Sequence, residues 1–73
     1  MKEQLLSLGW VMYYECVTPC AKQYFTNAKF PGYEIRVRTR KRSFNIILNN
    51  QIIAGTFQFT QLVEKLKKYG IYE

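Results

Sequence analysis

The stretch YEIRVRTRKRSFNIIL, residues 33–48, carries apolar residues at every second position in both of its halves. They are Tyr33, Ile35 and Val37 in the first half and Phe44, Ile46 and Leu48 in the second. A period of two is typical of β-strands that bury one face, because successive side chains point to opposite sides. The stretch therefore predicts a β-hairpin with one apolar face toward a core and one charged face away from it.

The register of this hairpin depends on its turn. If Lys41 and Arg42 are the two turn residues, Val37 pairs with Ile46 and every apolar side chain meets an apolar or neutral one. The turn lacks the Gly or Asn that two-residue hairpin turns favour. The pairing of the apolar residues supports the hairpin, with its first strand over residues 33–40.

Further strands are predicted on both sides of the hairpin. Asn49 and Asn50 tolerate positive φ and predict a second turn, followed by a short strand at residues 51–55. Residues 10–16, WVMYYEC, are rich in aromatic and β-branched residues and predict another strand. QYFT at residues 23–26 is a weaker strand candidate.

Helical spacing occurs near both ends of the sequence. Residues 2–8 predict a short helix that Gly9 stops. Residues 59–69 have apolar side chains at i, i+3, i+4 and i+7, which predicts an amphipathic helix with Thr60 as its N-cap and Gly70 as its stop.

These elements predict one small basic α+β domain over residues 1–73. It would consist of an antiparallel sheet of three to four strands, with an N-terminal and a C-terminal helix packed on one face, in an α-β-β-β-α-like order. The expected core is Leu5, Trp10, Ile35, Val37, Phe44, Ile46, Leu48, Leu62, Val63 and Leu66.

The composition is that of a compact protein, with 48% hydrophobic residues among 73. No run reaches the roughly 18 apolar residues of a membrane span, and the N-terminal apolar stretch lacks the features of a secretory signal. We therefore expect a soluble, cytoplasmic protein with no membrane partner. A chain of this size buries only about 60% of its unfolded surface on folding, which makes a homodimer a possible assembly.

The positive charge is confined to one segment. Residues 22–42 contain seven Lys and Arg side chains and a single carboxylate, Glu34, whereas the rest of the chain has four of each sign. The net charge of +6 thus belongs to this segment alone.

On a strand, Arg36, Arg38 and Arg40 would form a row spaced at roughly 7 Å, since each residue advances the chain by about 3.3 Å. Guanidinium groups bind phosphates in a bidentate manner, and phosphates along a nucleic acid strand repeat on a similar scale. The sequence therefore predicts contacts with DNA or RNA. The predicted binding residues are Arg36, Arg38, Arg40, Lys41, Arg42, Lys22, Lys29 and Asn45. Nearby aromatic residues would stack on bases if single strands are the target, and they are Tyr24, Phe25, Phe30 and Tyr33.

Other interpretations of this face remain open. It can be a solvated outer face whose charges prevent edge-to-edge aggregation, or a surface for an acidic protein. Ile47 and Ile52 would oppose each other on the same face. A register shift that moves Ile52 inward, a segment folded over the sheet, or a dimer contact would each explain this apolar pair.

No cofactor, metal or catalytic site is expected. A structural zinc site needs four ligands, usually Cys or His, and the chain has only Cys16, Cys20 and no histidine. These cysteines are expected to be partly buried thiols, with a metal site shared between subunits as the alternative. The lack of His and Asp excludes histidine bases and paired-aspartate sites. Glu34 could act as a base in a metal-independent ribonuclease, although a salt bridge is the simpler role.

The order of helix, antiparallel strands and helix resembles the double-stranded-RNA-binding-type scaffold, which also occurs in small HicA-type toxins. This is a resemblance of layout over much of the chain. Such toxins carry a histidine for RNA cleavage, which is missing here. True double-stranded-RNA-binding domains carry their basic stretch at the start of the last helix, where this chain has Thr60, Gln61 and Leu62.

The sequence thus predicts a small non-enzymatic nucleic-acid-binding domain that contacts phosphates through its arginine-rich hairpin. A protein-protein interaction or homodimeric module that uses Ile47 and Ile52 is the alternative. A metal-independent ribonuclease-like protein is the third.

Overall fold

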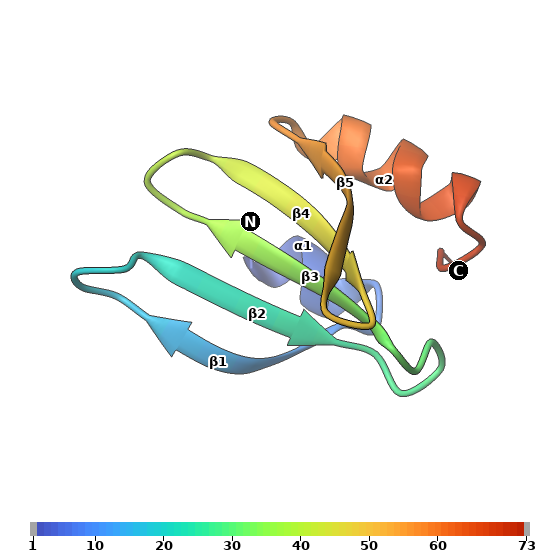
Figure 1. Cartoon of the computed structure of the whole chain (residues 1–73), viewed down its shortest axis with the longest axis horizontal. Coiled ribbons are helices and arrows are strands. Elements are labelled where there is room, and N and C mark those ends of the chain that lie inside the picture. The colour runs from blue at the N-terminus through green and yellow to red at the C-terminus, as the bar shows by residue number, and fades with distance from the viewer. Residues whose placement is uncertain (1, 73) are drawn as a thin grey trace.

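The computed structural model describes residues 2–72 and contains a five-stranded antiparallel sheet with two helices (Figure 1). In chain order the elements are α1 (Lys2–Ser7), β1 (Val11–Cys16), β2 (Lys22–Thr26), β3 (Tyr33–Arg38), β4 (Ser43–Leu48), β5 (Gln51–Thr56) and α2 (Phe59–Lys68). The strands form a simple meander in the order β1-β2-β3-β4-β5. The α+β class is confirmed, but the sheet has more than the three to four predicted strands. It therefore also differs from the three-stranded layout that the resemblance implied.

The extra strand is β2, which the sequence predicted only weakly. It pairs with β1 on one side and β3 on the other, so it is an interior strand of the sheet. Phe25 is its one fully buried side chain and lies opposite Ile35. One buried residue in five positions is too short a pattern for periodicity to identify a strand.

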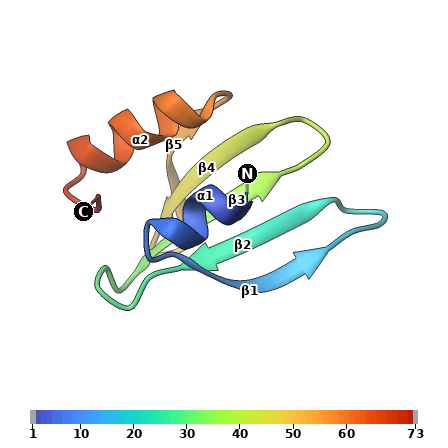
Figure 2. The same cartoon turned by 180° about the vertical axis from the view of Figure 1, so that it is seen from behind.

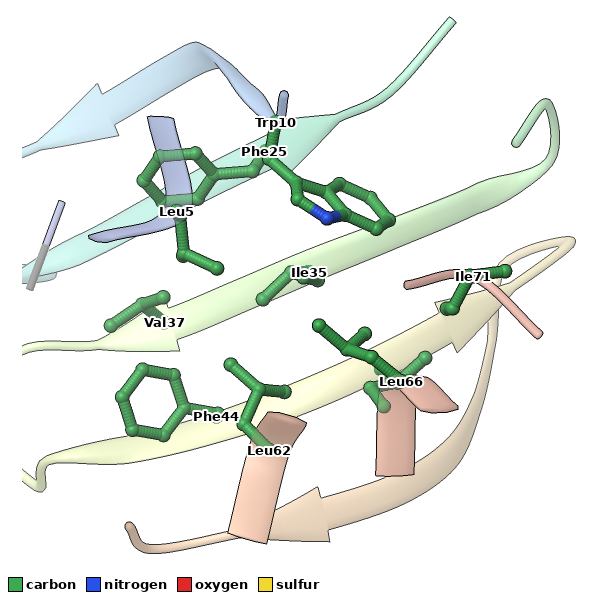
Figure 3. Close-up of a cluster of buried hydrophobic side chains, with 10 residues drawn as sticks. Leu5, Trp10, Phe25, Ile35, Val37, Phe44, Leu62, Leu66 and Ile71 are labelled. Atoms are coloured by element: carbon green, nitrogen blue, oxygen red, sulfur yellow. The ribbon is translucent and has the colours of Figure 1, made fainter. Parts of the chain in front are cut away.

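Both helices cover the same face of the sheet. Viewed from behind, α1 crosses in front of the middle strands and α2 lies over β5 (Figure 2). Their leucines converge with the inward side chains of β2, β3 and β4 (Figure 3). The buried cluster consists of Leu5, Trp10, Phe25, Ile35, Val37, Phe44, Ile46, Leu62, Leu66 and Ile71. The predicted packing on one face is therefore confirmed, except that Leu48 and Val63 are only half-buried.

The glycine-stopped helix ends follow the local sequence. Gly9 has φ +91, and the Trp10 N–H donates to the Leu5 carbonyl at 3.1 Å, the reach-back bond of a Schellman cap. The same bond ends α2, where the Ile71 N–H donates to the Leu66 carbonyl at 2.9 Å. In both cases an apolar residue after the glycine is folded back into the core.

The predicted N-cap of α2 is wrong. Thr60 lies inside the helix, whose N-cap is Gln58 in an extended conformation without a side-chain cap bond. The Phe59 ring packs against Phe44, with 6.2 Å between ring centroids. This packing explains why the helix begins at Phe59, since the contact outweighs the modest contribution of a threonine cap.

The central hairpin has a different register from the one predicted. Val37 lies opposite Phe44, two residues away from the predicted partner, and the turn comprises residues 39–42. Thr39 instead bonds to the neighbouring hairpin: its N–H donates to the Ala21 carbonyl at 2.9 Å and its hydroxyl to the same oxygen at 3.1 Å. A shift of two residues leaves every side chain on its predicted face because the period of a strand is two.

Ile47 lies opposite Ile52 on the face away from the helices, as predicted. The pairing of β4 with β5 is irregular between Ile46 and Ile47. Ile47 is 2% exposed and Ile52 is 66% exposed, so Ile52 is not moved inward.

No helix within residues 2–72 is both long and apolar enough to cross a membrane.

Thr56 provides a test of the packing. Its side chain is buried opposite Phe44, and its Oγ1 has no hydrogen-bond partner among residues 2–72. Thr56→Val replaces this hydroxyl by a methyl group of similar shape, so we expect the free energy of unfolding to rise by about 1 kcal/mol. Urea unfolding followed by circular dichroism measures the change.

Thr39→Val is the matched control, because the Thr39 hydroxyl does have an acceptor. We expect no gain in stability from this substitution. A Thr56→Val protein that unfolds at lower urea than the Thr39→Val protein would contradict the assignment of Thr56 as an uncompensated buried hydroxyl.

Candidate functional site

The sheet face away from the helices, here called the outer face, carries two rows of side chains that cross the strands. Strand register aligns Tyr14, Tyr24, Arg36 and Asn45 in the first row, called the tyrosine–arginine row. It aligns Cys16, Lys22, Arg38 and Ser43 in the second, called the basic row. The rows are two residues apart along each strand, which corresponds to about 6.7 Å.

The Tyr24 ring is the centre of the tyrosine–arginine row. The Tyr14 ring lies on one side, with 4.9 Å between centroids, and the Arg36 Cζ lies 4.7 Å from the ring centroid. Arg36 Nε also donates to Glu34 Oε2 at 3.1 Å. The Arg36 guanidinium is thus fixed by a cation–π contact and an ion pair, and both use only part of its donor set.

A β-bulge brings a third tyrosine to this face. Met12 lies opposite Phe25 and Tyr14 opposite Tyr24, so Tyr13 is an extra residue in β1. The Tyr13 ring centroid is 6.1 Å from that of Tyr24. Burial of its phenol and its hydrogen bond to the Glu34 carboxylate raise the pKa of Tyr13. Two consecutive tyrosines therefore reach the same ring, although regular alternation would place them on opposite faces.

A basic hollow of about 310 Å³ adjoins the basic row at the end of the sheet where the β1–β2 and β3–β4 turns lie side by side (Figure 1). It is lined by Pro19, Cys20, Ala21, Lys22, Arg38, Arg40 and Lys41. Four of these seven residues are cationic, and no carboxylate is among them. A hollow of this charge and size suits an anionic group such as a phosphate.

The structure brings together most of the predicted binding residues. Lys22, Arg36, Arg38 and Asn45 lie on the outer face, and Arg40 and Lys41 line the basic hollow beside it. The predicted row of three arginines on one strand is wrong, because β3 ends at Arg38 and Arg40 lies in the turn.

Two predicted binding residues lie apart from this arrangement. Arg42 is exposed in the turn with φ +50 and does not line the basic hollow. Lys29 lies in the loop between β2 and β3, at the opposite end of the sheet from the β3–β4 turn (Figure 1). Lys29 therefore does not extend the footprint of the basic hollow.

Of the four aromatic residues considered for base stacking, only Tyr24 lies on the outer face. Phe25 is in the core, Phe30 stacks on Trp10 with ring centroids 6.2 Å apart, and Tyr33 packs against the core cluster. The aromatic residues that the sequence did not point to are Tyr13 and Tyr14. The only signal for them is the consecutive pair in a predicted strand, which does not reveal the bulge.

Glu34 forms the salt bridge that was the simpler interpretation of its role. A separate hollow of about 290 Å³ lies at the other end of the sheet, between the 27–32 loop and the Asn49–Asn50 turn. Glu34 lines it and no Lys or Arg does, so its charge does not suit an anion.

Cys16 and Cys20 are free thiols that face each other across the β1–β2 turn. Cys16 is half-buried as expected, whereas Cys20 is exposed. The Cys20 thiol donates a hydrogen bond toward the Cys16 sulfur, which lowers the pKa of Cys16 and raises that of Cys20. Within residues 2–72, no cluster of three or more His, Cys, Asp or Glu side chains could hold a metal ion.

Comparison with known proteins yields no relative: no family model matches the sequence, and neither a curated protein nor a solved structure matches it.

The pKa directions of the two thiols predict their order of reaction with iodoacetamide. The thiolate is the nucleophile, so Cys16 should alkylate with a pH midpoint below that of Cys20, even though Cys20 is the more exposed. Short alkylation pulses between about pH 6 and pH 10, followed by peptide mass spectrometry, give both midpoints.

Cys20→Ala is the matched variant because it removes the main cause of the lowered pKa. The midpoint of Cys16 should then rise toward the usual thiol value of about 8.5. Equal midpoints in the wild type, or an unchanged Cys16 midpoint in the variant, would contradict the hydrogen bond between the thiols.

Proposed function

We propose that the protein is a small non-enzymatic nucleic-acid-binding domain that contacts phosphates through its outer face and basic hollow. The proposal rests on one observation: cationic side chains are placed directly opposite and beside one another with no carboxylate between them. Lys22 lies opposite Arg38 in the basic row, and both line the hollow with Arg40 and Lys41.

This arrangement is unfavourable for folding alone. Like charges directly opposite each other on neighbouring strands destabilise a sheet, and opposite charges there would stabilise it by roughly 0.2–1 kcal/mol. The chain places Lys22 opposite Arg38, while the carboxylates of the neighbouring strands have other partners: Glu34 pairs with Arg36, and Glu15 accepts a hydrogen bond from Gln23. A local rule broken without compensation is typical of a functional surface. A bound polyanion would supply the missing negative charge.

The position of Arg36 favours phosphate binding over a purely solvated role. Its guanidinium is held by the Tyr24 ring and Glu34, so little side-chain entropy is lost when it binds a further acceptor. Nucleic acids present many acceptors at regular spacing, and a cationic surface of several residues gains from each counterion released. A membrane surface is a weaker candidate because these cations lie on strands and turns and not on an amphipathic helix.

A binding module also agrees better than an enzyme with the state of Glu34. This carboxylate accepts hydrogen bonds from Arg36 and Tyr13. A general base needs its carboxylate available to the substrate hydroxyl, and both partners compete for that position.

A second candidate is a homodimeric or protein-binding module at the β5 edge of the sheet. The observation in its favour is the exposure of Ile52 at 66% and of Phe57 at 73%. Exposed apolar side chains beside an unpaired strand edge favour association with another chain. Sedimentation of the wild type and of Ile52→Ser over a range of concentrations distinguishes this candidate, because only it requires a dimer that the substitution weakens.

Salt-dependent binding tests the proposed function. We expect a labelled oligonucleotide to bind near 50 mM salt, with log affinity falling against log salt by about 0.7 per phosphate contact on a single strand and 0.9 on a duplex. In the Arg38→Ala/Arg40→Ala protein the slope should become shallower by about two contacts, since both side chains line the basic hollow. Fluorescence anisotropy gives both slopes.

Lys67→Ala/Lys68→Ala is the matched control. It removes the same formal charge from exposed positions of α2, on the other side of the sheet. Its slope should match that of the wild type. An equal reduction of the salt slope in the two double variants would indicate a response to net charge alone. An absence of binding in folded wild-type protein would contradict the proposal.

A further inference from the structure

We infer that the ligand of this site is single-stranded nucleic acid, with bases stacked on the tyrosines of β1 and phosphates in the basic row and hollow. This inference rests on the proposed function and deepens it. The observation behind it is the juxtaposition of an exposed tyrosine cluster with a cationic surface on one sheet face.

The tyrosine cluster consists of Tyr13, Tyr14 and Tyr24. Tyr13 is 51% exposed and Tyr14 is 44% exposed, whereas Tyr24 is half-buried between Tyr14 and Arg36. Two of the three rings thus present surface to solvent, and the third supports them. Aromatic surface in this position is available for stacking with a planar partner.

The rings are held in place before any ligand binds. Tyr14 and Tyr24 lie with 4.9 Å between centroids at an interplanar angle of 37°, and the Tyr13 ring centroid lies 6.1 Å from that of Tyr24. A ring that is already ordered loses little conformational freedom when a base stacks on it.

The spacing of the two rows suits one nucleotide. The tyrosine–arginine row and the basic row are about 6.7 Å apart along the strands, which is the scale of the distance from a base to its phosphate. A base on Tyr14 therefore has its phosphate within reach of Lys22 and Arg38, and the basic hollow receives the phosphate that follows. Rows spanning four strands, at about 4.8 Å each, offer room for two or three nucleotides.

A duplex does not use this surface well. Its bases are stacked on one another and offer no free face to the tyrosines. Reading its major groove requires a protruding helix or a two-stranded ribbon. Both helices lie on the opposite face, and β3 and β4 are flanked by β2 and β5. A duplex would contact the cations alone and leave Tyr13 and Tyr14 without a role.

The test uses four labelled ligands: two eight-nucleotide single strands, one of oligothymidine and one of oligouridine; an abasic strand with the same number of phosphates; and an eight-base-pair duplex. Anisotropy titrations at several salt concentrations compare the wild type with Tyr14→Leu, which keeps an apolar side chain in β1 but removes the ring. Phe57→Leu is the matched control, because Phe57 is an exposed aromatic residue near the opposite edge of the sheet.

We expect the wild type to bind the single strand more tightly than the abasic strand and the duplex. Tyr14→Leu should lose about 5- to 150-fold in affinity for the single strand, the range for one stacked base. Its affinity for the abasic strand and its salt slope should stay unchanged, and Phe57→Leu should behave as the wild type. Tyr13→Leu provides a second variant, and the comparison of abasic with normal strand in the wild type needs no variant at all.

Two other results are distinguishable. If the duplex and abasic strand bind as tightly as the single strand, and Tyr14→Leu binds like the wild type, the stacking inference is overturned while the proposed function stands. If none of the ligands binds to folded protein, the proposed function and the inference both fall.

Discussion

The two-sided pattern of β3 is the constraint on which the rest of the structure depends. Ile35 and Val37 are fully buried under the helices, which forces Arg36 and Arg38 to the outer face. Since β2 and β4 pair with β3 in register, their own side chains inherit the same division between core and outer face. The charged face is thus a consequence of the core: a one-residue slip would bury the arginines and expose the apolar residues.

On the outer face, the contacts of Arg36 are stabilising, whereas the contact between Lys22 and Arg38 is destabilising. Arg36 has an ion pair and an aromatic neighbour, whereas Lys22 and Arg38 oppose each other without a counter-charge. The first arrangement orders a guanidinium, and the second leaves a positive potential at the rim of the basic hollow. The β-bulge at Tyr13 adds aromatic surface next to this potential. Together these features give the face a stacking half and a cationic half, which is the basis of the function proposed above.

The sequence and the structure agree at elements that local residues specify, either by a regular apolar period or by a turn or helix-stop residue. The hairpin of β3 and β4, the Asn49–Asn50 turn with both residues at positive φ, and the glycine-stopped helices were all predictable. The failures have physical causes. Thr60 lost its role as N-cap because Phe59 packs on Phe44, and the turn of the central hairpin widened because Thr39 bonds to Ala21 on the neighbouring hairpin. Each correction depends on a contact between residues distant in sequence.

The sequence by itself determined which side chains of β3 and β4 face the helices and which face away from them, because the period of a strand is a local property of the chain. It also determined that the excess positive charge lies within residues 22–42. Only the tertiary structure decided which of those charges lie together, because pairing of β2 with β3 brings Lys22 opposite Arg38 while the loop geometry carries Lys29 to the other end of the sheet. The tyrosine cluster is likewise a tertiary feature: a single extra residue in β1 lets the consecutive Tyr13 and Tyr14 emerge on the same side, and no period in the sequence marks that position.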